Sequence, residues 1–160
     1  MKTLLIPTDF DLKSLNCVPG LARRYAPEKV NIILVHMMKI TDNIQELLML
    51  SRRSTDYQHI SEDFYNTCTE IRHSNAAISS IKVEFFYGST VAVFKNFLEA
   101  QEVDAIVMLE NYEYRMLNKN SIQPSLLVSR SGLPLIHTDC ATTPKLTVVK
   151  TDEALVEESV

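Results

Sequence analysis

Five residues directly follow short apolar runs in this sequence and could take part in chemistry: Asp9, His36, Gly88, Glu110 and His137. In an open parallel α/β sheet, ligands bind outside the carboxyl ends of the strands, so such positions are the first to consider. Asp9 is the most suggestive, because a carboxylate there can accept hydrogen bonds from a ribose or an adenine. The same carboxylate can instead organise the following turn, and the sequence leaves both uses open.

Chemistry that needs a group of residues is not supported by the spacing. A receiver-type phosphoryl site would combine Asp9 and Asp11 with an aspartate and a lysine after later runs, where Glu110 and His137 stand instead. The histidines lack the spacing of metal ligands, and no G-x-S-x-G motif surrounds a serine. The sequence therefore predicts no catalytic residues, no metal site and a protein that is not an enzyme.

Composition limits the function further. The chain has 160 residues, 46% of them apolar, which suits one domain with a single core. Its three glycines, Gly20, Gly88 and Gly132, are too dispersed for G-x-G-x-x-G or for the P-loop motif. Three widely spaced cysteines without a C-x-x-C pair favour a reduced, cytoplasmic protein, and no apolar run reaches the length of a membrane helix.

The net charge is concentrated at one end of the chain. Residues 151–160 hold four acidic residues and no Lys or Arg, whereas residues 1–150 hold 16 residues of each sign. A neutral body gives no electrostatic reason to expect nucleic acid or an anionic membrane as a partner.

The elements that would position these residues follow from the hydrophobic pattern. Short apolar runs alternate with longer amphipathic stretches, which is typical of βαβ units around a parallel sheet. The run at 30–36 is almost continuously apolar, as in a strand covered on both faces. The pattern predicts strands at residues 3–7, 30–36, 81–87, 105–109 and 133–137.

Helices are predicted between these strands. The expected helices begin near Asn16, cover two parts of 43–77, begin after Ser89 or Thr90, and span 121–130 with Gly132 as the C-cap. In the second part of 43–77, Cys68 shares an apolar face with its neighbours at helical spacing, so we expect a core residue.

The pattern changes after residue 138. We expect an α/β domain over 1–138 and an extension over 139–160, in which 145–150 could form a further short strand. The acidic residues 151–160 lack aromatic side chains and are expected to be mobile.

Four segments together resemble the universal stress protein family over residues 1–138. They are LLIPTDF at 4–10 with Ser14 shortly after, VNIILVH at 30–36, GST at 88–90 and VDAIVM at 103–108. The resemblance implies an open, doubly wound, five-stranded parallel sheet in the order 3-2-1-4-5 and a homodimer formed through the last core strand. Because 133–136 would be an apolar sheet edge, pairing with a partner is a sensible use of it.

The resemblance also implies a set of site residues. Family members that bind ATP use an aspartate after the first strand, which Asp9 matches, and a backbone contact at the second strand, which Val35 would supply. Gly88 is a further family position. The family's phosphate signature, G-x-x-G-x9-G-[ST], follows the fourth strand, and here only Ser121 matches it.

The missing glycines have a physical consequence. Phosphate loops need glycine so that backbone N–H groups can approach the anion in conformations that other residues avoid. Glu110 and Glu113 would repel a triphosphate, and Arg115 and Lys119 would offset this repulsion only in part. Tyr112 and Tyr114 could fill the phosphate space themselves.

These residues lead to one preferred function and one alternative. We expect a stress-response or regulatory module that acts as a homodimer and through contacts with other proteins, without ATP or another cofactor. The alternative is a sensor that binds an adenine nucleotide or another small ligand through Asp9, Val35 and Gly88. The missing loop and the lack of an evident general base both disfavour ATP hydrolysis or phosphoryl transfer.

Overall fold

The computed structural model describes residues 1–38, 58, 60–110, 112, 114–117 and 121–139. Its elements in chain order are β1 (Lys2–Pro7), the 3₁₀ helix η1 (Leu12–Leu15), α1 (Val18–Tyr25), β2 (Val30–Met38), α4 (Glu62–Ser74), β3 (Ile78–Tyr87), α5 (Val91–Ala100), β4 (Ala105–Glu110), α6 (Ser125–Val128) and β5 (Leu135–Asp139).

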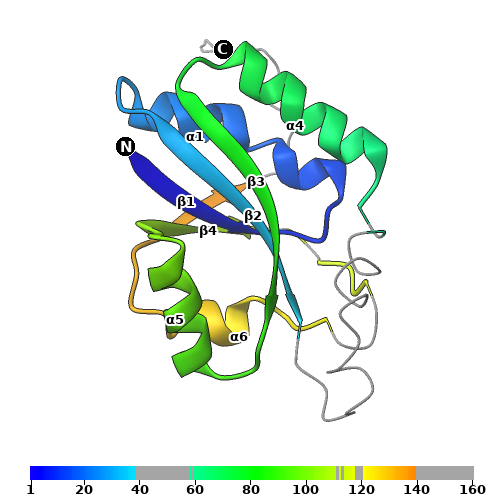
Figure 1. The fold of residues 1–160 in the computed structure, drawn as a ribbon, viewed down its shortest axis with the longest axis vertical. Coiled ribbons are helices and arrows are strands. Elements are labelled where there is room, and N and C mark those ends of the chain that lie inside the picture. Colours follow the sequence, from blue (N-terminus) through cyan, green and yellow to red (C-terminus); the bar gives the residue numbers. More distant parts are fainter. Residues whose placement is uncertain (39–57, 59, 111, 113, 118–120, 140–160) are drawn as a thin grey trace.

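The strands form one parallel sheet in the order β3-β2-β1-β4-β5, as predicted. β1 lies at the centre, where Leu4 pairs with Ile32 on one side and with Ala105 on the other. Helices α1 and α4 cover one face of the sheet, and α5 and α6 cover the other (Figure 1). The expectation of a doubly wound α/β fold is therefore confirmed.

The alternation of side chains along β1 divides the core into two layers. Leu4 and Ile6 join the cluster beneath α1 and α4, whereas Leu5, between them, joins the cluster beneath α5 and α6. All three side chains are fully buried, because neighbouring residues of a strand point to opposite faces of a covered sheet.

The predictions of a helix near Asn16 and of a second helix within 43–77 hold with shifted boundaries. The chain leaves β1 through η1, whose N-cap Asp11 accepts the N–H of Lys13 at 3.0 Å. Helix α1 then begins at Val18, two residues later than expected, with Pro19 in its first turn, where a missing N–H costs nothing. In α4 the Cys68 side chain is buried, which confirms its expected place in the core.

Helix α5 begins as expected after Thr90, whose side chain accepts the N–H of Val93. Phe94 and Leu98 form its buried stripe. Two smaller boundaries also differ from the prediction, since β3 begins at Ile78 and β5 begins at Leu135.

The predicted helix over 121–130 is wrong in its extent. α6 covers only Ser125–Val128, and Ser121 forms an isolated antiparallel bridge with Met38 at the end of β2. Extended pairing with β2 therefore replaces the first turn of the expected helix. Gly132 is also not the C-cap, which is Ser129; Gly132 takes φ +82° in the turn that leads to β5.

Three sequence predictions lie outside the described residues. These are the first of the two helices expected in 43–77, the strand expected at 145–150 and the mobile acidic stretch expected at 151–160. None of the helices in the described part of the chain has the length and apolar character that crossing a bilayer requires.

Candidate functional site

The segment that follows β4 returns across the carboxyl ends of β1 and β2. We call its described residues, 112, 114–117 and 121–122, the β4–α6 segment. The strand order reverses between β1 and β4, and in open α/β sheets this is the position where ligands bind. The β4–α6 segment leaves the sheet at this position and meets Asp9 there.

Asp9 is almost completely buried, with 1% of its surface exposed. Its Oδ1 accepts hydrogen bonds from the Tyr112 hydroxyl at 2.5 Å and from the Asp11 N–H at 3.1 Å. Its Oδ2 accepts the Arg115 N–H at 2.8 Å. These donors compensate for the removal of a carboxylate from water. Of the two uses that the sequence leaves open, the structure shows the turn-organising one, and the carboxylate also anchors the β4–α6 segment.

The turn after β1 fixes the direction of Asp9 through an unusual backbone conformation. Phe10 has φ +63°, a left-handed conformation that costs about 1–2 kcal/mol for a residue with a side chain. Its N–H donates to Thr8 Oγ1 at 2.9 Å, and its ring packs against Phe64 and Phe85. The hydrogen bond and the buried ring together offset the strain.

Tyr112 closes over Asp9 from the β4–α6 segment. Its ring packs in a T-shaped contact against Tyr114, with centroids 4.9 Å apart, and both rings lie against the core cluster beneath α1 and α4. Burial and, secondly, the hydrogen bond to Asp9 raise the pKa of Tyr112 above its ordinary value of 10.0. The phenol is therefore a neutral donor near pH 7, and Tyr112 covers Asp9 Oδ1.

Arg115 supplies the positive charge of the site. Its Nη2 donates to the main-chain oxygen of Asp9 at 3.1 Å, and its Nε lies 3.7 Å from Asp9 Oδ2 and 3.9 Å from Asp11 Oδ2. Because 57% of the side chain is exposed, water screens these ion pairs. The partly buried hydrogen bond from the Arg115 main-chain N–H to the Asp9 carboxylate is thus the stronger part of the contact.

A second anchor joins the β4–α6 segment to β2 through His36. His36 Nδ1 lies 2.8 Å from the main-chain oxygen of Thr8, which only accepts, so Nδ1 carries the proton. In a neutral ring Nε2 then accepts from the Ser121 hydroxyl at 2.7 Å. Ser121 Oγ in turn accepts the Leu117 N–H at 3.0 Å. Ser121 is therefore buried in a hydrogen-bond network that holds the segment down.

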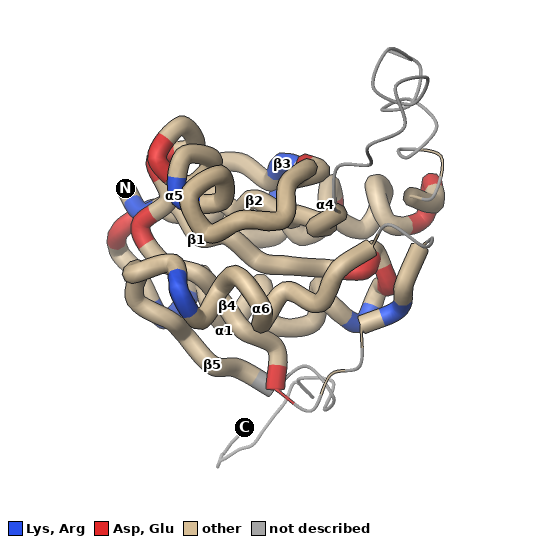
Figure 2. Tube along the Cα trace, turned by 90° about the horizontal axis from the view of Figure 1, so that it is seen from below, with Lys and Arg blue, Asp and Glu red and all other residues tan. Residues whose placement is uncertain are grey.

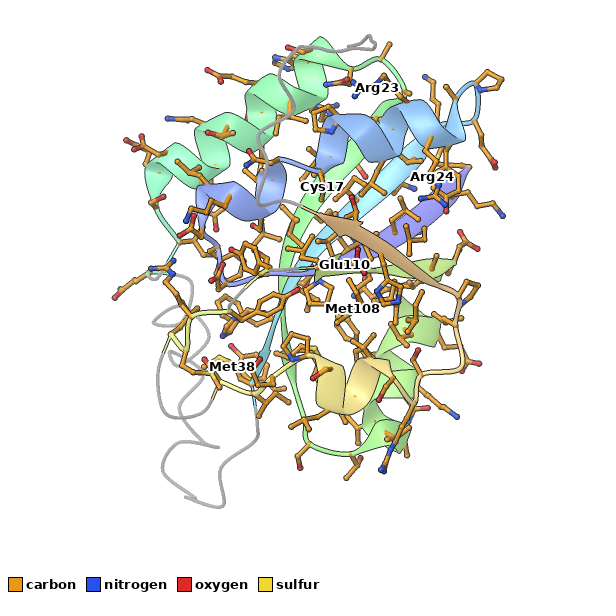
Figure 3. All side chains as sticks on the ribbon, turned by 180° about the vertical axis from the view of Figure 1, so that it is seen from behind. Cys17, Arg23, Arg24, Met38, Met108 and Glu110 are labelled. Atoms are coloured by element: carbon orange, nitrogen blue, oxygen red, sulfur yellow. The ribbon has the colours of Figure 1, made fainter. Side chains whose placement is uncertain are left out.

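The end of β2 extends this second anchor by main-chain bonding. The Ile122 N–H donates to the main-chain oxygen of Met37 at 2.9 Å, beside the bridge between Met38 and Ser121. Met38 is labelled in Figure 3, where the segment leading to α6 crosses the end of β2.

Val35 and Gly88, the other two predicted site residues, have structural roles in the fold. The main-chain oxygen of Val35 accepts the Thr8 N–H at 2.8 Å and so holds the end of β1 to β2 just before Asp9. Val35 is fully buried.

Gly88 ends β3, where its N–H donates to Met38 at 2.9 Å. A Cβ on Gly88 would lie 2.9 Å from both Phe86 Cζ and Val93 Cγ1, closer than real Cβ contacts. Glycine at this position is therefore explained by the packing of the turn between β3 and α5.

The remaining candidates lie elsewhere along the same edge of the sheet. Glu110 ends β4, but His137 lies in the middle of β5, which continues to Asp139, so His137 is not at the strand end as the sequence predicted. His137 Nδ1 lies 3.8 Å from Glu110 Oε2, and both side chains are 55% exposed. Two strands separate β5 from β2, so His137 lies far from His36, as expected. Across the described ranges no group of three or more His, Cys, Asp or Glu side chains could hold a metal ion.

Two surface pockets lie away from Asp9. One, of about 470 Å³, lies between the end of α5 and the residues before β5 and is lined in part by Glu99, Asp104 and Ser131. The other, of about 410 Å³, lies between α4 and β3 and is lined in part by Cys68 and Arg72. Since neither includes a residue that contacts Asp9, the site at the carboxyl ends of β1 and β2 is a different feature.

Sequence reasoning missed two contacts of this site. It considered Arg115 only as a partial counter-charge for phosphate, and it did not connect Ser121 with His36. The sequence signal for the second contact was His36 at the end of the nearly continuous apolar run at 30–36, because a buried histidine needs hydrogen-bond partners. The identity of the partner required the path of the chain after β4.

Of three comparisons with known proteins, the one with solved structures found matches, and these concern the fold. A scan of protein-family models and a search of curated proteins found no match. Among solved structures, universal stress protein UspA from Lactobacillus plantarum matches at a TM-score of 0.52 and 15% identity, covering 85% of this chain and 96% of that one. A universal stress protein in complex with cAMP matches at 0.50 and 16%, covering 89% and 98%.

A structure described only as that of a hypothetical protein matches at a TM-score of 0.52 and 18% identity, covering 86% of this chain and 96% of its own. At such low identities these matches concern the fold. The chain therefore has the α/β fold of universal stress proteins, and the function must be argued from its own residues.

Proposed function

We propose that this protein is a non-enzymatic stress-response or regulatory module that acts as a homodimer in the cytoplasm and does not bind ATP. The observation that carries the proposal is that the Asp9 carboxylate is already hydrogen-bonded to residues of the same chain. Its carboxylate accepts hydrogen bonds from Tyr112 and Arg115 of the same chain. A nucleotide using Asp9 would first have to break both contacts.

The residues around Asp9 disfavour the binding of a triphosphate. No glycine stands between Leu109 and Ser121, so the backbone lacks the residues that most easily turn several N–H groups toward a phosphate. Asp11 and Glu110 add negative charge near the ends of β1 and β4. A triphosphate would meet like charge with few donors to compensate for it.

The partners are proposed from the surface. Lys and Arg are interspersed with Asp and Glu over the described trace in Figure 2, which gives no electrostatic reason to favour nucleic acid or an anionic membrane over protein partners. At the sheet edge, β5 pairs with β4 through Ile136 and its neighbours, while Leu135 is 37% exposed. We propose that a second copy pairs with this edge.

Isothermal calorimetry with Mg-ATP tests the first part of the proposal. We expect no binding heat at micromolar protein and no ATP turnover. Micromolar binding that Asp9→Ala abolishes would contradict the proposal. It would favour the alternative, a ligand sensor acting through Asp9, Val35 and Gly88. The cAMP in one structural neighbour is the reason to keep that alternative under test.

Thermal-shift measurements with adenosine and AMP separate the two functions. Stabilisation by adenosine or AMP, without need for a triphosphate, would favour the sensor. The regulatory module predicts no shift with either compound. Tyr112→Ala serves as the companion variant, because it removes the side chain that closes over Asp9.

Light scattering tests the dimer. The full chain should have the mass of a dimer at micromolar concentration, and Leu135→Asp at the β5 edge should shift it toward the monomer. Leu126→Asp is the matched control, because Leu126 is more exposed, at 63%, and lies on α6 instead of the sheet edge. A monomer for the unchanged chain would refute the proposed assembly.

A further inference from the structure

The donors that satisfy Asp9 come from one short stretch of chain and form a distinctive set. Tyr112 supplies a phenol hydroxyl, and Arg115, three residues later, supplies a main-chain N–H and a guanidinium. Together they satisfy both carboxylate oxygens and the main-chain oxygen of Asp9. The position beside Asp9 is thus filled by a Tyr-x-x-Arg pattern of the chain itself.

Anything that displaces the β4–α6 segment must replace these donors. Asp9 is 1% exposed, so leaving its carboxylate without partners would be costly. A nucleoside can return neutral hydroxyl or amino donors but no positive charge. A peptide with tyrosine and arginine at the same spacing returns the phenol, the N–H and the guanidinium together.

Tyr112 and Arg115 lie near the surface, so a partner peptide could replace them beside Asp9. Arg115 is 57% exposed on its side chain, Met116 is 51% exposed, and Tyr112 is half-buried. Tyr112, Tyr114 and Leu117 pack against the core cluster beneath α1 and α4, but each is only partly buried, and hydrogen bonds to Asp9 complete the contact with the end of β1. Such a contact can open locally without unfolding the sheet.

We infer that the position beside Asp9 is a peptide-binding site for a Tyr-x-x-Arg segment of a partner protein, with Tyr112 and Arg115 of this chain as the built-in competitor. The inference rests on the proposed function, since it specifies how a module without ATP makes protein contacts. In the closed state the chain's own tyrosine and arginine occupy the site. A partner binds when its segment replaces them.

The test uses a fluorescent peptide with the sequence of residues 111–117, Asn-Tyr-Glu-Tyr-Arg-Met-Leu. Anisotropy is measured against the full chain, against Tyr112→Phe and against Tyr112→Ala. We expect the tightest binding to Tyr112→Ala, which removes one of the two competing residues and leaves Arg115, and the weakest to the unchanged chain. An intramolecular competitor lowers the apparent affinity by the fraction of molecules in which the position is open.

Changes within the peptide avoid any effect on folding of the protein. Replacing the residue that matches Tyr112 with Phe, or the residue that matches Arg115 with Gln, should each weaken binding to the Tyr112→Ala protein about tenfold, as expected for one charge-assisted contact. A scrambled peptide of the same composition is the control for unspecific attraction.

Several results would overturn the inference. These are equal binding of the parent and scrambled peptides, equal affinity for the unchanged chain and Tyr112→Ala, or no detectable binding to folded Tyr112→Ala. Circular dichroism establishes that the variant is folded, and Tyr112→Phe, which keeps the ring, provides a second host if it is not. Light scattering and Mg-ATP calorimetry report on the proposed function separately, so the failure of one does not imply failure of the other.

Discussion

Replacing Tyr112 with Phe removes one hydroxyl from the contact between the β4–α6 segment and β1. The hydroxyl donates to Asp9 Oδ1 at 2.5 Å, and Asp9 is 1% exposed. A hydrogen bond to a charged group contributes about 1.5–3 kcal/mol, so the free energy of unfolding should fall by about that amount. For a chain of this size that corresponds to a decrease in Tm of roughly 3–12 °C.

The two remaining donors limit the loss. The Asp11 and Arg115 N–H groups still satisfy Asp9 in the variant, so the carboxylate keeps partners on both oxygens. We therefore expect the variant to fold and to lie toward the lower end of the range. Urea unfolding at pH 7, followed by circular dichroism, measures the change from the midpoint and slope.

Tyr25→Phe is the matched control for this measurement. Tyr25 is also half-buried and packs against the same core cluster, but its hydroxyl makes no hydrogen bond within the described residues. The control should change the free energy of unfolding by less than about 0.5 kcal/mol. If the two variants were equally stable, the contact between Tyr112 and Asp9 would not hold the segment, and the argument for an occupied site would fail.

Three further predictions concern pH, a thiol and two glycines. Because the pKa of Tyr112 is raised in the folded protein, its stabilisation is present below pH 10 and is lost as pH rises above 10; Tyr112→Phe should show a shallower alkaline loss in pH-dependent unfolding. Burial raises the pKa of Cys68 to about 11, so DTNB at pH 8 should modify Cys68 only after denaturation, as peptide mapping would show. Gly88→Ala should cost about 1–3 kcal/mol in urea unfolding, because the added Cβ meets two side chains at 2.9 Å. Gly20→Ala within α1, where the nearest atom is 3.8 Å away, should instead stabilise by about 0.4–1 kcal/mol. Rapid DTNB reaction of native Cys68, or equal effects at the two glycines, would contradict this packing.

The elements were predictable where the signal is local. The apolar run at 30–36 became β2, and Pro19 with its neighbours placed the start of α1 within two residues. In both cases hydrophobic periodicity or the chemistry of proline acts within a few residues. The helix expected at Ser121 failed for the opposite reason, because the hydroxyl there bonds His36, which lies 85 residues away.

The candidate site was predictable only in part. Asp9 was identified from its place after the first strand, whereas Tyr112 was considered only as an aromatic side chain that could fill the phosphate space. The sequence did not predict that Asp9 and Tyr112 contact each other, because the two residues are 103 positions apart in the chain. No periodicity carries information over that separation.

The sequence by itself determined the order of strands and helices, the family resemblance and the absence of glycine between Leu109 and Ser121. These follow from residue types and local spacing. Only the tertiary structure decided that the segment without glycine returns to Asp9 and donates to it through Tyr112 and Arg115. The sheet brings the ends of β1 and β4 together, and a buried carboxylate at that point must be satisfied by whichever donors the chain places beside it.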